Sequence, residues 1–130
     1  MPPTSVLILA CVMLGACAHH GAFPFRASEP DAPLPPNTVR LDAQVQFCDA
    51  AGEATYTCQL IANRVIGYGR GGAVTPPGTP LEAAFSHRDL EIERPPEDGA
   101  QIDVLILIDT PPGVPREYRA TRLYSYTPPN

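Results

Sequence analysis

The stretch VRLDAQVQFC, Val39 to Cys48, alternates apolar and polar side chains. A period of two places successive side chains on opposite faces of an extended chain, so the pattern predicts a β-strand with one buried face. The apolar positions that we expect in the core are Val39, Leu41, Ala43, Val45 and Phe47.

Five further segments have strand character, and none keeps the 3.6-residue period of a helix over about ten residues. They are 55–69, 79–86, 89–94, 102–109 and 116–127. The alternation in the first of them slips between Ala62 and Val65, which indicates a bulge or a bend. The run from Val104 to Ile108 is apolar throughout, which is typical of a strand covered on both faces.

The composition suits many short strands joined by sharp turns. A chain with 17 prolines and 10 glycines is a poor helical bundle, whereas 44% hydrophobic residues suffice for a core. We therefore predict an all-β domain over residues 38–130, a small six-stranded barrel or sandwich. Its long, bent second strand is similar in shape to that of oligonucleotide/oligosaccharide-binding (OB) barrels. The net charge of −5 and the scattered arginines argue against nucleic-acid binding.

The N-terminus, MPPTSVLILACVMLGACAHH, carries an apolar run from Val6 to Ala16. The run is too short to span a bilayer as a helix but suits the core of a signal peptide. It ends in Leu14-Gly15-Ala16-Cys17, which resembles the lipobox of bacterial lipoproteins. The resemblance implies cleavage before Cys17 and a lipid on its thiol.

Ala18 follows the cysteine, at the position where an Asp would retain an enteric lipoprotein in the inner membrane. The resemblance therefore implies an anchor in the outer membrane, with the domain facing the periplasm. Secretion as a soluble protein is the alternative, because Ala16-Cys17-Ala18 is itself an A-x-A cleavage site. Residues 1–16 are predicted as the signal peptide and 17–37 as the lipidated cysteine with a flexible, Pro/Ala-rich tether.

The stretch TPPGTPLE, Thr75 to Glu82, has a near-copy in TPPGVPRE, Thr110 to Glu117. In each copy the second Pro suits the second position of a type II turn, and Gly supplies the left-handed conformation that follows. We interpret the two copies as turns of the same chemistry, each leading into a strand, and not as a recognition motif.

Cys48 and Cys58 are the two cysteines that remain in the domain, and an even pair in a small exported protein predicts a disulfide. Cys48 falls on the polar face of its strand, whereas Cys58 shares a face with Leu60. The first strand must therefore end at Phe47 or contain a bulge before the two cysteines can face each other.

The candidates for catalysis have simpler explanations. Ser86, His87 and Asp89 are the residue types of a hydrolase triad, but neighbours along a chain point in different directions. Glu91 and Glu93 share a face as paired carboxylates do, yet no second catalytic segment accompanies them. We predict no enzyme activity, no cofactor and no metal site.

The last strand offers the best candidate for a binding face, because Tyr and Arg dominate contact hot spots. Its members are Tyr118, Arg119, Arg122, Tyr124 and Tyr126. The sequence thus favours a lipid-anchored binding protein or an accessory of an envelope assembly, with the membrane and an envelope protein as its partners. An inhibitor of an exported lytic enzyme such as lysozyme is the second hypothesis, and a small envelope enzyme the third.

Lipidation at Cys17 can be tested directly. Mass spectrometry of the membrane fraction is expected to find an acylated N-terminal peptide that begins at this residue. Cys17→Ser should release the domain from the membrane, because the thiol that carries the lipid is lost. A soluble mature protein that begins at His19 would contradict this prediction.

Overall fold

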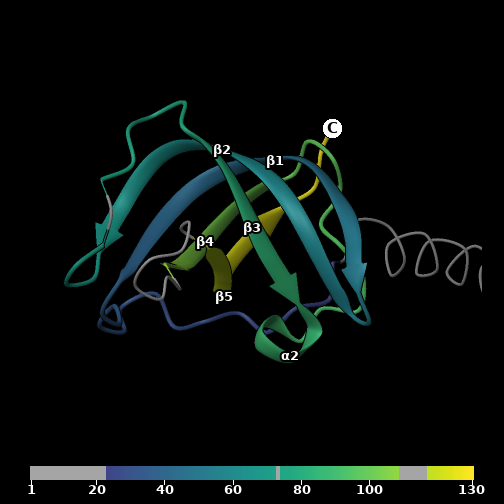
Figure 1. The fold of residues 1–130 in the computed structure, drawn as a ribbon, viewed down its shortest axis with the longest axis horizontal. Coiled ribbons are helices and arrows are strands. Elements are labelled where there is room, and N and C mark those ends of the chain that lie inside the picture. Colours follow the sequence, from purple (N-terminus) through teal and green to yellow (C-terminus); the bar gives the residue numbers. More distant parts are fainter. Residues whose placement is uncertain (1–22, 73, 109–116) are drawn as a thin grey trace, which may run out of the picture.

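Five β-strands form a closed barrel in the part of the chain that the structure, a computed structural model, describes: residues 23–72, 74–108 and 117–130. The elements are β1 (Thr38–Gly52), β2 (Thr55–Tyr68), β3 (Pro80–Ser86), α2 (His87–Leu90), β4 (Gln101–Ile108) and β5 (Tyr118–Thr127). Their order around the barrel is β1-β2-β3-β5-β4 (Figure 1). All pairs are antiparallel except β3 with β5.

The all-β prediction is confirmed, and the domain is a barrel and not a sandwich. Its five strands, with a long and bent second strand, agree with the OB-like shape suggested above. Its interior is filled by alternate side chains from every strand, as barrels of this size require. Fully buried members include Leu41, Val45, Leu60, Phe85, Ile102, Ile106 and Leu123. In β4, Val104 and Ile106 point into the core, and Leu105 between them points to the opposite face. Leu105 is also fully buried, so the prediction of a strand covered on both faces is confirmed.

The sixth predicted strand, residues 89–94, is wrong. The Ser86 side chain accepts a hydrogen bond from the backbone N–H of Asp89 and caps the short helix α2. Glu91 then takes a left-handed conformation with φ of 56° and ends the helix. Leu90 and Ile92 are buried, as their alternation suggested, but in a helical turn and the coil that follows it.

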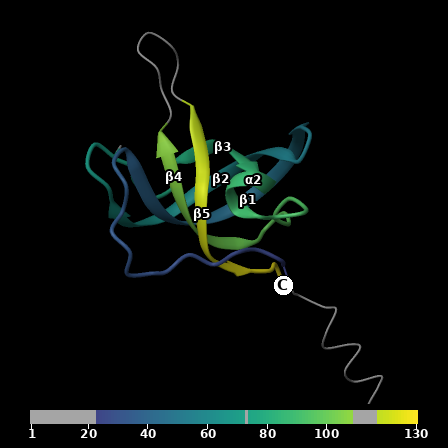
Figure 2. The same ribbon diagram turned by 90° about the horizontal axis from the view of Figure 1, so that it is seen from below.

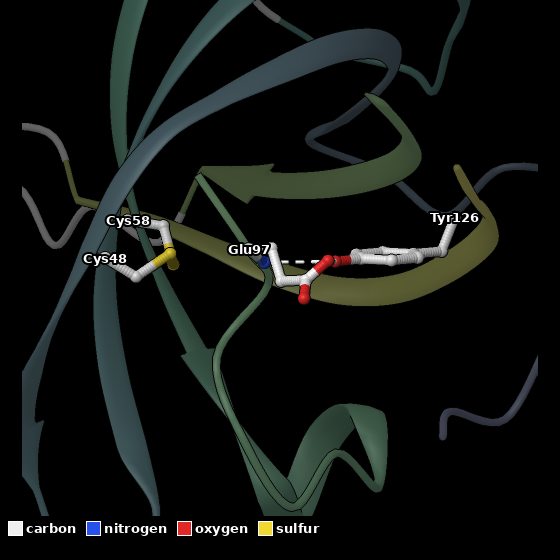
Figure 3. The surroundings of a disulfide bond; sticks show 4 residues. All are labelled: Cys48, Cys58, Glu97 and Tyr126. Atoms are coloured by element: carbon white, nitrogen blue, oxygen red, sulfur yellow. Dashed lines mark hydrogen bonds between the residues drawn. A yellow bond between two sulfur atoms is a disulfide. The ribbon is translucent and has the colours of Figure 1, made fainter. Parts of the chain in front are cut away.

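A bulge in β1 brings the two cysteines together. Val45 pairs with Leu60 and Phe47 with Gln59, so Gln46 is an extra residue on β1. The extra residue reverses the alternation. Phe47, predicted in the core, is 46% exposed, and Cys48 turns inward opposite Cys58. The predicted disulfide is present (Figure 3).

Two register shifts in β2 confirm the bend expected between Ala62 and Val65. Asn63 and Ile66 are the extra residues against β1. Bulges increase the local twist and bend a strand. Because β2 curves here, the two long strands wrap around the core instead of forming a flat ribbon (Figure 1).

Residues 23–37, which we expected to be part of the flexible tether, form an N-terminal strap along the outside of the barrel (Figure 2). Phe23 is buried and stacks on Tyr126, with ring centroids 4.1 Å apart. Ala27 forms a parallel bridge with Leu123, whose carbonyl accepts a hydrogen bond from the N–H of Ser28 at 3.0 Å. The compact domain therefore includes residues 23–37, which we had assigned to the tether.

The end of the strap packs closely on the glycine-rich segment after β2. The N–H of Asn37 donates to the carbonyl of Arg70 at 2.6 Å. A Cβ atom on Gly69 would lie 1.8 Å from the carbonyl oxygen of Pro35. Gly69 is thus required by the close approach of two backbones, which no larger residue allows.

The turn before β3 has the predicted chemistry. Gly78 has a φ of 85°, and the N–H of Thr79 donates to the carbonyl of Pro76 at 3.2 Å. These are the features of a type II turn with Pro77 at its second position. The corresponding glycine of the second copy, Gly113, lies outside the described residues.

The disulfide should contribute to stability mainly by restricting the unfolded chain. With a sequence separation of 10 residues, reduction is expected to lower the free energy of unfolding by roughly 2–3 kcal/mol. Urea denaturation of the oxidised and reduced domain, each monitored by circular dichroism, measures the difference. Thiol labelling of the untreated domain should find neither cysteine reactive, and identical urea midpoints would contradict a stabilising role.

A second prediction concerns the turn. Nothing lies within 4 Å of a Cβ atom built on Gly78, so a substitution there acts through backbone conformation alone. Gly78→Val should destabilise the domain by about 1–3 kcal/mol, because a β-branched residue is strained at positive φ. Gly78→Asn is the matched control, since Asn tolerates this conformation better. If Gly78→Val melted at the same temperature as the unaltered domain, the turn would not require glycine.

Candidate functional site

A groove follows the seam between β3 and β5. The two strands share a single bridge, between Ala84 and Arg119. Two recesses adjoin this bridge, with cavity volumes of about 530 Å³ and about 410 Å³, and both are lined by Ala84 and Arg119. We call the two recesses together the β3 groove.

The first recess lies along β3 before the bridge. Its wall is formed by residues 79–84, by Thr57 of β2 and by residues 117–119. Glu82 projects from the outer face of β3 and accepts a hydrogen bond from Nε2 of Gln59 at 2.6 Å. The small side chains of Thr57 and Ala84 leave the recess open next to this carboxylate.

The second recess lies between the β1–β2 turn and the start of α2. Glu53 contributes from the turn, and residues 86–89 contribute from the end of β3 and from the helix. Arg119 reaches from β5, with its Nε 3.5 Å from Oδ2 of Asp89. Over both recesses, the carboxylates of Glu53, Glu82, Asp89 and Glu117 outnumber the guanidinium groups of Arg88 and Arg119. The groove is therefore acidic.

The polar residues beside the second recess are engaged in structural contacts. The Ser86 hydroxyl caps α2, and Nδ1 of His87 lies 2.8 Å from the carbonyl oxygen of Ile92. Asp89 is bonded to Ser86 through its backbone and not through its carboxylate. Within residues 23–72, 74–108 and 117–130, no group of three or more His, Cys, Asp or Glu side chains is placed to hold a metal ion. The chemistry that the groove offers is hydrogen bonding and charge.

The predicted binding face on β5 is divided by the structure. Against β4, Thr121 and Tyr124 are extra residues, so the alternation of β5 reverses twice. Tyr118 and Arg119 line the first recess. Arg122 lies opposite Leu105 and away from both recesses.

Tyr126 belongs to the packing of the strap and not to the groove. Its hydroxyl accepts a hydrogen bond from the N–H of Glu97 at 3.0 Å, drawn as a dashed line in Figure 3. Its ring stacks on Phe23. Burial of the ring raises the pKa of the Tyr126 hydroxyl above its usual value, with the nearby Glu97 carboxylate adding to the shift.

Tyr124 is covered by a partly buried ion pair on the outer wall of the barrel. Arg40 binds Asp103 through two hydrogen bonds, of 2.9 and 2.6 Å, and its guanidinium carbon lies 3.9 Å from the centre of the Tyr124 ring. The hydrogen bond to Asp103 raises the pKa of Arg40 despite partial burial. Arg40 also donates to the carbonyl of Pro30, which ties the strap to this cluster.

Sequence reasoning identified Tyr118 and Arg119 but missed β3 and α2 as their neighbours in the groove. The alternation of TPLEAAFS does place Glu82 and Ala84 on the outer face. Nothing local in the sequence signals that β5 lies beside them, because the β3–β5 bridge joins distant segments.

Comparison of the chain with protein-family models, with curated proteins and with solved structures finds no match. In the described part of the chain, no helix is long and apolar enough to cross a membrane.

Proposed function

We propose that this chain is an exported, lipid-anchored binding protein of the bacterial cell envelope, without a catalytic role, and that the β3 groove binds its partner. The observation that carries the proposal is the disulfide between Cys48 and Cys58. Disulfides persist in oxidising compartments such as the periplasm and are rare in the cytosol. The bond therefore supports the export signal and the lipobox that end at Cys17.

The strap keeps the barrel close to its anchor. Cys17 is separated from Phe23 by residues 18–22 alone. A chain of this length spans at most about 20 Å when fully extended. A lipid on Cys17 would therefore hold the barrel near the outer membrane, where an envelope protein is the natural partner.

The chemistry of the groove supports binding and not catalysis. Its charged side chains suit recognition of a complementary surface, and charge complementarity supports both specificity and fast association. The same excess of carboxylates favours a second candidate function, inhibition of an exported lytic enzyme such as lysozyme, if that enzyme presents a basic surface.

Two arginines on β5 provide a matched test. Arg119 lines both recesses, whereas Arg122 lines neither, and both are partly exposed. Arg119→Ala should weaken binding of the envelope partner by about 2 kcal/mol, roughly 30-fold, as truncation of a contact hot spot does. Arg122→Ala should leave binding almost unchanged. The partner is captured by cross-linking in the membranes of the native bacterium, identified, and titrated against each variant.

Three results would point elsewhere. Equal affinities for the two arginine variants, with melting temperatures unchanged, would remove the β3 groove from the contact. Loss of function in His87→Ala, with the fold intact, would favour an enzyme. Inhibition of lysozyme by the purified protein would favour the inhibitor over the envelope accessory.

A further inference from the structure

The edge of β3 that faces the first recess offers backbone hydrogen-bonding groups. On its other side, β3 pairs with β2 from Pro80 to Ser86. Toward β5, the described residues form only the bridge between Ala84 and Arg119. The part of β3 before Ala84 therefore borders the first recess, and no described strand lies against it.

The direction of each backbone group follows from the pairing with β2. The N–H of Ala62 donates to the carbonyl of Thr79 at 2.9 Å. In an antiparallel pair, residues that exchange hydrogen bonds recur at every second position, so Leu81 and Ala83 turn their backbone groups toward β2. Glu82 and Ala84 therefore turn their backbone N–H and C=O groups away from β2, toward β5. Ala84 forms the bridge to β5, and Glu82, two residues earlier, directs its N–H and C=O toward the first recess.

The side chains beside this edge leave room for another strand. Ala84 and Thr57 are small, and the recess between β3 and residues 117–119 measures about 530 Å³. Pro80 has no N–H and stands at the start of the strand, so a partner that pairs along this edge meets its first donor at Glu82. The groove thus combines a backbone donor and acceptor with an excess of carboxylates.

We propose that the β3 groove receives an extended, basic polypeptide segment, which adds as a strand to the edge of β3 at Glu82. The inference rests on the proposed function, because it takes the groove as the contact surface for the envelope partner. Main-chain hydrogen bonds supply the affinity in this mode of recognition, and side chains supply the specificity. Basic side chains on the segment match the carboxylates of Glu82 and Glu117, which line the first recess.

An extended peptide fits this groove better than a sugar chain. Sugars bind best against the flat rings of Trp, Tyr and Phe, and Tyr118 is the one residue of these types among the described residues that line the two recesses. A peptide instead offers the regular alternation of donors and acceptors that Glu82 can pair with.

The experiment uses the full-length protein in detergent and a synthetic peptide of alternating threonine and arginine. Fluorescence anisotropy measures binding, and amide hydrogen exchange measures protection at Glu82. We expect the peptide to bind and the exchange of the Glu82 amide to slow by at least about tenfold, since the edge N–H becomes hydrogen-bonded. The same peptide with every backbone nitrogen methylated should bind at least about tenfold more weakly, because it cannot donate.

Variants of Glu82 separate the backbone from the side chain. Glu82→Pro removes the edge N–H, leaves the pairing with β2 intact and should weaken peptide binding about tenfold. Glu82→Ala keeps the N–H and should weaken it less. On the unaltered protein, a peptide with glutamate in place of arginine should bind more weakly than the arginine peptide. If Glu82→Pro fails to fold, the methylated peptide tests the same hydrogen bond on the unaltered protein.

Four outcomes would overturn the inference. They are equal binding of the methylated peptide, equal binding of the glutamate peptide, unchanged exchange at Glu82, and binding of chitotetraose but of no peptide. Failure here is distinct from failure of the proposed function. If Arg119→Ala still loses the envelope partner while no peptide binds, the groove is a contact surface that does not use strand addition. If the peptide binds but the arginine variants do not differ, strand addition stands and the proposed partner contact falls.

Discussion

Closure of the barrel depends on the bending of β1, its longest strand. Its first part, Thr38 to Gln44, pairs with β4, while almost its whole length pairs with β2. A straight strand could not remain in both ladders, and the bulges of β1 and β2 supply the bend. The bulge at Gln46 also turns Cys48 inward, so the geometry that closes the barrel also places the disulfide.

The same closure leaves the seam between β3 and β5 weakly paired. One edge of β5 pairs with β4. The other edge contacts β3 at Arg119 and the N-terminal strap at Leu123. The strap occupies the second part of this edge. The β3 groove lies around the first part, where only one bridge joins the strands. The contact surface that we propose is thus the portion of the seam that neither β3 nor the strap fills.

The fold could be predicted further than the site. Alternation identified all five strands, although in the long second strand the pattern is interrupted. Turn chemistry identified the conformation of Gly78. For the site, sequence reasoning selected Tyr118 and Arg119 and placed Glu82 on an outer face. It grouped Arg122, Tyr124 and Tyr126 with them, and these three residues do not line the groove. The two bulges of β5 that separate them are imposed by the register with β4 and leave no mark in the alternation.

The sequence by itself determined the all-β class, the type of turn before β3 and the pairing of the two cysteines. Each of these follows from local chemistry: alternation of burial, the φ preferences of proline and glycine, and one pair of cysteines within the domain. Tertiary structure alone decided the two bulges of β5, the strap and the groove. Phe23 belongs to the core only because Tyr126, at the other end of the chain, lies beneath it. A segment whose order comes from such distant contacts has no period of its own, and that is why it resembled a flexible tether.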